Sequence, residues 1–159
     1  MPTFQINFSR PAGQVIAQYF DFVRFGRAGY TAIHGSSHEI AQYCAKEIGT
    51  VDGFEIIHDG DPSNGIPAVV WTQAEGSAHS FTLYDLADRL RMRGWQVPAY
   101  PFTGKLAHKA FQRILVKRGF TREMADLLLT DIKDAIAYLS IHPQKAESSP
   151  AQQGSYNHL

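Results

Sequence analysis

Ser9 and Arg10 stand directly before Pro11 and a long stretch of apolar residues at helical spacing. Proline suits the first turn of a helix, because its missing N–H would lack a partner there anyway. The hydroxyl and the cation would then lie at the mouth of a helix, where free N–H groups and the positive end of the dipole attract an anion. An ordinary helix start without a ligand is the alternative interpretation, and local features leave both open.

Arg113 lies inside a predicted strand, where its cation could bind a carboxylate. One face of this strand carries Phe111, Arg113, Leu115 and Lys117. A guanidinium between two apolar side chains is costly unless an acidic partner or a ligand meets it. Its planar fork matches a carboxylate in a two-point contact. A structural ion pair or a solvated charge is the alternative interpretation.

The other reactive side chains do not form a recognisable site. Of the seven histidines, only His34 and His38 have the spacing of ligands on one helix, and no acidic or cysteine residue completes a metal site around them. We therefore expect no metal, and we expect Cys44 in the core. No glycine-rich phosphate loop, nucleophile elbow or paired-carboxylate motif is present, so these residues alone do not identify an activity.

Apolar spacing predicts the helices that would position these residues. A helix is expected from Pro11 to about Gly26, and a second helical stretch should end at Gly49. Ser36 and Glu39 have the spacing of a capping box, so the second helix could restart there, although a continuous helix is also possible.

Alternating and β-rich runs predict four strands, at residues 54–58, 66–72, 95–99 and 111–117. Pro98 lacks a donor for a strand ladder, which favours an edge position or a strand end for the third strand. Cap-like Thr82 opens a helix that Gly94 ends, and Thr121 opens a helix that Pro143 ends.

The predicted order is helix–helix–strand–strand–helix–strand–strand–helix–tail. This order fits an α+β fold, in which helices back a small and mostly antiparallel sheet. The first two helices are long for so small a sheet, so we expect them to pack on something outside this chain. The end of the chain is rich in Ser, Gln, Ala and Gly, a composition typical of a mobile tail.

Composition excludes several classes of protein. Fifteen basic residues balance fifteen acidic ones without a basic stripe, which argues against nucleic acid and anionic membranes as partners. The single cysteine, Cys44, excludes an internal disulfide and suits a reducing cytosol. No apolar run has the length of a membrane span, and the first residues lack the pattern of a signal peptide.

Four longer runs resemble one known family. They are INFSRPAGQVIAQYF at residues 6–20, FTLYDLADRLRMRGWQVPAY at 81–100, QRILVKRGF at 112–120 and the terminal QQGSYNHL. These runs are spread over almost the whole chain, and their SRPAGQ and RGWQVPAY portions are specific. The chain resembles the C-terminal part of bacterial glutamate decarboxylases, which are pyridoxal-phosphate enzymes of fold type I.

The resemblance implies a C-terminal fragment of an enzyme that converts L-glutamate to 4-aminobutyrate and carbon dioxide. Residues 1–28 would be the end of the large cofactor-binding domain with the inter-domain helix. Residues 29–142 would form the small C-terminal domain, and residues 143–159 a flexible tail. In this family the Schiff-base lysine and the acid that pairs with the pyridinium nitrogen lie upstream. The fragment alone is therefore expected to be inactive and not to bind the cofactor covalently.

Four residues match functional positions of the family. Phe8 and Ser9 match a pair that reaches the cofactor phosphate of a neighbouring subunit, and Arg113 matches the arginine that binds the substrate α-carboxylate. His158 matches the penultimate histidine of the acid-resistance enzymes, where the tail blocks the active site at neutral pH. Protonation removes the nucleophilic lone pair of imidazole, so acid would release the block. A disordered terminus is the alternative interpretation of His158.

The resemblance also implies partners and a location. The substrate would be L-glutamate, and the large pyridoxal-phosphate domain of the same enzyme would be a partner. A dimer-based homo-oligomer, with a hexamer as one option, and a cytoplasmic location are expected. No nucleic acid is expected, and a membrane only at acid pH, if at all.

Other hypotheses remain open from the sequence. A free-standing interaction or regulatory module could bind a partner chain or an amino acid, and a truncated gene could produce the same chain. The coding DNA upstream of Met1 would discriminate these cases. The first helices could also drive self-association, because they would expose apolar surface in the absence of a large domain.

Overall fold

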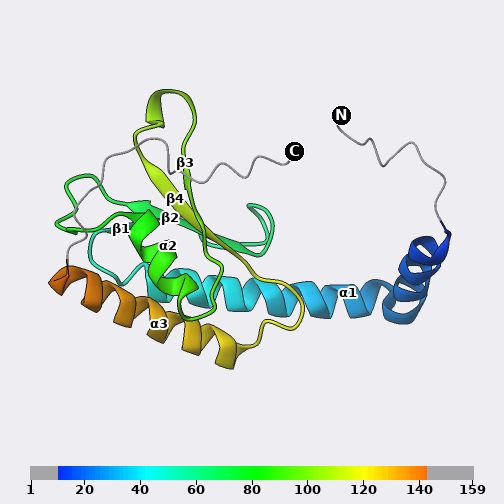
Figure 1. Ribbon diagram of the computed structural model, residues 1–159. Coiled ribbons are helices and arrows are strands. Elements are labelled where there is room, and N and C mark those ends of the chain that lie inside the picture. The colour runs from blue at the N-terminus through cyan, green and yellow to red at the C-terminus, as the bar shows by residue number, and fades with distance from the viewer. Residues whose placement is uncertain (1–10, 143–159) are drawn as a thin grey trace. The chain divides into compact units, whose positions relative to one another are not determined.

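The computed structural model describes residues 11–142 (Figure 1). The chain divides into two compact units. The described part of the first unit is residues 11–30, and that of the second is residues 31–142. Helix α1 (Gly13–Ile48) has residues in both units, and all strands and the other helices belong to the second.

A break at Gly26 interrupts α1. The backbone there has φ 54° and ψ −168°, which lies outside the helical region and which only glycine adopts readily. The helix then continues through Ser36 without a restart, so the continuous alternative is correct at that point. The predicted end is confirmed, because Ile48 is the last helical residue before Gly49. Pro11 lies before the first helical residue rather than in the first turn, contrary to the prediction.

The sheet of the second unit has four strands in the order β1-β2-β4-β3. Every neighbouring pair is antiparallel. The predicted α+β class is therefore confirmed. The register of β1 against β2 shifts between Ile56 and His58, which leaves Ile57 as a bulge. The strands are β1 (Phe54–His58), β2 (Ala68–Gln73), β3 (Ala99–Pro101) and β4 (Ala110–Leu115).

The third strand differs from its prediction, because residues 95–98 are not in a strand. Trp95 instead packs partly against the core, and its indole Nε1 donates to Asp131 Oδ2 at 2.6 Å. Pro98, which has no N–H to donate, ends this irregular segment directly before β3 begins at Ala99. The edge position that Pro98 predicted is confirmed, because β3 pairs with β4 alone.

Helices α2 (Leu83–Arg91) and α3 (Arg122–Ile141) begin at the predicted caps. Thr82 and Asp85 form a full capping box, in which each side chain accepts a hydrogen bond from the other residue's backbone N–H. Thr121 Oγ1 accepts from the backbone N–H of Met124 at 3.3 Å. These caps satisfy N–H groups that the first turn of a helix leaves without partners.

One hydrophobic core joins the three helices to one face of the sheet. Figure 1 shows α3 beside the part of α1 after Thr31, and Tyr43 Oη donates to Asp126 Oδ1 between them at 2.7 Å. The largest fully buried side chains come from α1, the sheet, α2, α3 and the segment after β4. They are Cys44, Ile48, Val69, Trp71, Leu83, Leu86, Leu90, Gln112, Val116, Leu128, Ile132 and Leu139.

Within residues 11–142, no helix combines the length and the apolar character that crossing a bilayer would require.

Candidate functional site

Strand β4 places Arg113 on the sheet face opposite the core. Its neighbours Gln112 and Ile114 are buried, whereas Arg113 and Leu115 are exposed. This alternation confirms the predicted division of the strand into two faces. Gln112 is fully buried, and its Nε2 donates to the carbonyl of Val97 at 2.9 Å, which fixes the inward face of the strand.

Three aromatic rings lie beside Arg113, two on its strand pair and one, Phe102, directly after β3. Tyr100 on β3 is paired with Phe111 on β4, and their ring centroids are 5.6 Å apart. The ring of Phe102 lies 4.9 Å from that of Phe111. The guanidinium carbon of Arg113 lies 5.8 Å from the centroid of Tyr100, within the range of a cation–π contact. We call Tyr100, Phe102 and Phe111 the ring cluster.

No carboxylate of residues 11–142 forms an ion pair with Arg113. Arg122 shows the contrast, because its Nε lies 3.5 Å from Asp126 Oδ1. The internal ion pair that was one interpretation of Arg113 is thus absent from this part of the chain. Its N–H edges remain available to a carboxylate that reaches the open face. Its assignment to the substrate stays a prediction.

The ring cluster was not among the residues predicted from the sequence. Only a short sequence pattern indicates this cluster: Tyr100 and Phe102 flank Pro101 at strand spacing, and Phe111 follows after a turn. The predicted strand ended at residue 99, so the alternation of Tyr100 and Phe102 fell outside it. A strand shifted by three residues, to 98–102, would have placed both rings on one face.

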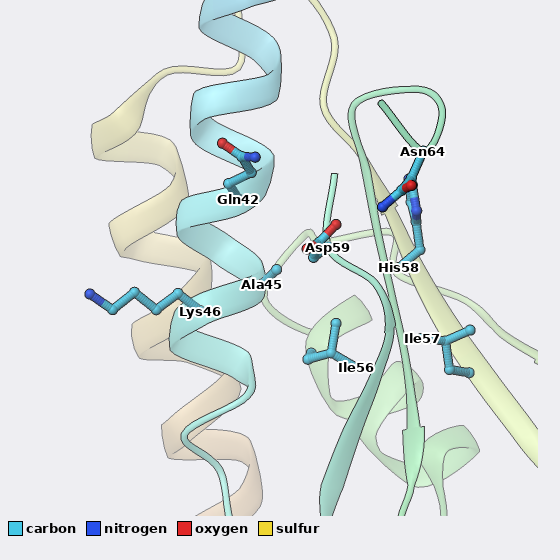
Figure 2. Close-up of a pocket in the computed structure, with 8 residues that line it drawn as sticks. All are labelled: Gln42, Ala45, Lys46, Ile56, Ile57, His58, Asp59 and Asn64. Atoms are coloured by element: carbon cyan, nitrogen blue, oxygen red, sulfur yellow. The ribbon is translucent and has the colours of Figure 1, made fainter. Parts of the chain in front are cut away.

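A second candidate is an open hollow of about 640 Å³ between α1 and β1. Figure 2 shows that Lys46 points away from β1, while His58 and Asn64 lie near each other on the hairpin. His58 Nε2 lies 3.0 Å from the carbonyl oxygen of Ile66. The hollow thus offers one imidazole already in contact with backbone, without a lysine directed into it.

The described residues do not fit the covalently held cofactor that the resemblance implies. No lysine of residues 11–142 is buried, and a lysine that forms a Schiff base needs a desolvated site to lower its pKa. Lys109 is the least exposed of those in ion pairs, and its Nζ lies 4.0 Å from Glu75 Oε2 at the surface.

The remaining predicted residues have varied positions. Cys44 is fully buried as predicted, and burial raises the pKa of its thiol to about 11. His38 Nδ1 lies 2.6 Å from the carbonyl oxygen of Gly60. No group of three or more His, Cys, Asp or Glu side chains within residues 11–142 is arranged to hold a metal ion. The predicted sites at Phe8, Ser9 and His158 lie outside the described residues.

Residues 1–73 match the family model described as the pyridoxal-dependent decarboxylase conserved domain. The glutamate decarboxylase of Aliivibrio fischeri is 44% identical over 158 residues, which are 99% of this chain and 34% of that protein. The glutamate decarboxylase of Lactococcus lactis subsp. lactis is 44% identical over 140 residues, which are 88% of this chain and 29% of that protein.

Solved structures give the same result for the fold. The glutamate decarboxylase of Lactobacillus brevis superimposes with a TM-score of 0.78 at 41% identity, over 88% of this chain and 31% of that one. A sphingosine-1-phosphate lyase of Burkholderia pseudomallei shares the fold with a TM-score of 0.61 at 20% identity, over 81% of this chain and 26% of that one. The chain therefore belongs to the pyridoxal-dependent decarboxylase family, and it spans about a third of the length of the glutamate decarboxylases that it matches.

Proposed function

We propose that this chain is the C-terminal part of a glutamate decarboxylase, which converts L-glutamate to 4-aminobutyrate and carbon dioxide with pyridoxal phosphate. The observation that carries the proposal is the 44% identity to the Aliivibrio fischeri glutamate decarboxylase over 99% of this chain. The chain spans only 34% of that protein, so the remaining polypeptide would supply the catalytic lysine. The fragment alone would be inactive.

In this proposal Arg113 binds the α-carboxylate of glutamate. Three features support the role: its side chain is exposed on the open sheet face, it forms no ion pair within residues 11–142, and its fork fits a carboxylate. A two-point contact would fix the direction of the carboxylate as well as its position. Arg113 would thereby orient the bond that the reaction breaks.

Phe8 and Ser9 would contact the phosphate of the cofactor in a neighbouring subunit. The support is the SRPAGQ run, which places a hydroxyl and a cation shortly before α1 begins at Gly13. A helix start offers free N–H groups to a phosphate. This role requires a dimer-based homo-oligomer, with a hexamer as one option, because the phosphate belongs to another subunit.

His158 would make the enzyme respond to pH. A neutral imidazole near the end of the chain could block the active site, and its protonation would release the block. Removal of residues 157–159 from the intact enzyme should then extend activity toward neutral pH. We also propose that the intact protein is a cytoplasmic enzyme of acid resistance, which would meet a membrane only at acid pH, if at all. An unchanged pH–activity profile would reject the switch.

The proposal can be tested in a chimaera of the Aliivibrio fischeri glutamate decarboxylase, in which this chain replaces the segment that it matches. We expect glutamate decarboxylation by the parent chimaera. Arg113→Ala should lower kcat/KM by about 100-fold, since a charged two-point contact contributes about 3 kcal/mol. The absorbance of bound pyridoxal phosphate should remain.

Lys117→Ala provides the matched control, because Lys117 is an exposed cation near the same strand. We expect it to retain the kinetics of the parent. An inactive parent with bound cofactor would reject the proposed function. An active parent that tolerates Arg113→Ala would retain the function and remove Arg113 from the site.

A further inference from the structure

The ring of Tyr100 lies beside the arginine that we assign to the substrate. Tyr100 pairs with Phe111 across the two strands, and Arg113 follows two residues later on the same face. Diagonal neighbours in an antiparallel sheet are within reach of aromatic and long side chains. The distance of 5.8 Å from the guanidinium carbon to the Tyr100 centroid fits this diagonal contact.

Two features hold Tyr100 in place. Its ring packs on Phe111 at 5.6 Å, and Phe111 in turn packs on Phe102 at 4.9 Å. The buried hydrogen bond from Gln112 Nε2 to the carbonyl of Val97 joins β4 to the segment just before β3. Tyr100 is therefore supported by the strand pair, although 39% of its surface is exposed.

A neutral ring can order an arginine without occupying the groups that bind a carboxylate. An acidic partner would also fix Arg113, but it would accept the same N–H groups that the substrate needs. A ring face attracts the cation through its quadrupole and leaves the N–H edges free. An unsupported arginine loses rotamer entropy when a ligand fixes it, and a ring contact removes part of that cost in advance.

We propose that Tyr100 is a positioning residue for Arg113, which holds the guanidinium on the open sheet face so that its fork meets the substrate carboxylate. The inference rests on the proposed function and adds a residue to its site. Tyr100 would act through Arg113 and would not touch the reacting bond. Its loss should therefore weaken the binding of glutamate more than it slows turnover.

The test compares Tyr100→Leu, Tyr100→Phe and Tyr138→Leu in the chimaera described above. Tyr138 is the matched control, because it is also 39% exposed and also lies over an arginine, Arg89, at 3.8 Å. Tyr100→Leu should raise KM for glutamate by about 3- to 10-fold, with kcat within about 2-fold of the parent, as expected for a cation–π contact. Tyr100→Phe keeps the ring and should behave like the parent, as should Tyr138→Leu.

A second measurement does not depend on activity. In the 159-residue chain, the NMR order parameter of the Arg113 Nε–H bond should fall in Tyr100→Leu and remain unchanged in Tyr138→Leu. Parent kinetics or an unchanged order parameter in Tyr100→Leu would overturn the inference while Arg113→Ala still tests the proposed function. Equal effects of Tyr100→Leu and Tyr138→Leu on KM would also overturn it. A chimaera that binds cofactor but cannot decarboxylate glutamate would reject the function and this inference together.

Discussion

The start of α1 and the unit from Thr31 onward both carry large apolar side chains at helical spacing, but they differ in burial. Leu86 and Leu128 in the second unit are 0% and 1% exposed, whereas Phe20 and Val23 in the first are 57% and 66% exposed. Four more side chains near Phe20 are exposed to a similar degree: Val15, Ile16, Tyr19 and Phe22.

The difference teaches that the two regions depend on different sources of stability. The second unit has its own core, so its own side chains supply the hydrophobic free energy of folding. The first unit shows an apolar surface of the kind that normally meets another chain or domain. The decarboxylase family model includes this region, and the chain spans about a third of its relatives.

The largest expected difference between the two regions is in the reactivity of a thiol. Cys44 is fully buried, so a thiol reagent should reach it only when the second unit opens. A cysteine at Val23, introduced by Val23→Cys in a Cys44→Ala background, should react at least about 1,000-fold faster, given a typical folding stability. Ellman's reagent at neutral pH measures both rates, and urea should make them equal. Equal rates without urea would contradict the comparison.

The same thiol predicts a pH dependence. Burial raises the pKa of Cys44 from 9.0 to about 11, so the unfolded chain loses this proton at lower pH than the folded chain does. Its contribution to stability is complete below pH 9 and is lost as the pH rises toward 11. Urea unfolding across this range should show a shallower decline for Cys44→Ala than for the parent. Parallel declines would exclude Cys44 as a source of the slope.

Truncation of a core side chain should have the next largest effect. Leu128→Ala should lower the free energy of unfolding by about 2–5 kcal/mol, because it leaves a cavity in a closed core. Phe20→Ala should change it by less than about 0.5 kcal/mol, since its side chain contributes little to that core. Leu127→Ala is the control on the same helix, because Leu127 is 62% exposed. A large effect of Phe20→Ala on urea unfolding would show that the first unit is part of the cooperative fold.

The smallest expected effects come from alanine substitutions at two glycines with positive φ, one in each unit. A Cβ at Gly60, where φ is +82°, would lie 2.6 Å from Ala41 Cβ, so Gly60→Ala should destabilise the chain by about 2 kcal/mol. Nothing lies within 4 Å of a Cβ at Gly26. Gly26→Ala should therefore favour a continuous helix at this position, because alanine is more stable than glycine in a helix by about 1 kcal/mol. Far-UV circular dichroism should show more helix in Gly26→Ala. Loss of helix there would mean that the break is required.

The sequence predicted the elements well where local chemistry determines them. Thr82 with Asp85 has the spacing of a capping box, and that box forms. The break in α1 at Gly26 lies where the first helix was predicted to end, whereas Ser36 with Glu39 has the spacing of a capping box and forms no restart. Inside a long helix the backbone N–H groups already have partners, so a cap-like pair has nothing to satisfy. The shift of β3 toward Tyr100 depends on pairing with β4, which spacing within one segment does not reveal.

The candidate site was likewise predictable only where it depends on a single segment of the chain. Strand alternation predicted that Arg113 and Leu115 share one face and that Gln112 and Ile114 lie on the other, and the structure confirms this division. The absence of an ion pair within residues 11–142 and the contact with Tyr100 could not be predicted, because both depend on segments that meet only in the folded sheet. Resemblance, rather than local chemistry, suggested the roles of Phe8, Ser9 and His158, which stay predictions.

The bulge at Ile57 has a consequence for aggregation. β1 and β3 are the two edges of the sheet, and an exposed regular edge can pair with the edge of another molecule. The register shift between Ile56 and His58 disturbs the ladder that an incoming strand would need, and β3 is only three residues long and ends at Pro101. Both edges are thereby poor templates for intermolecular strands, so a sheet of this size can remain four-stranded even when the chain is concentrated.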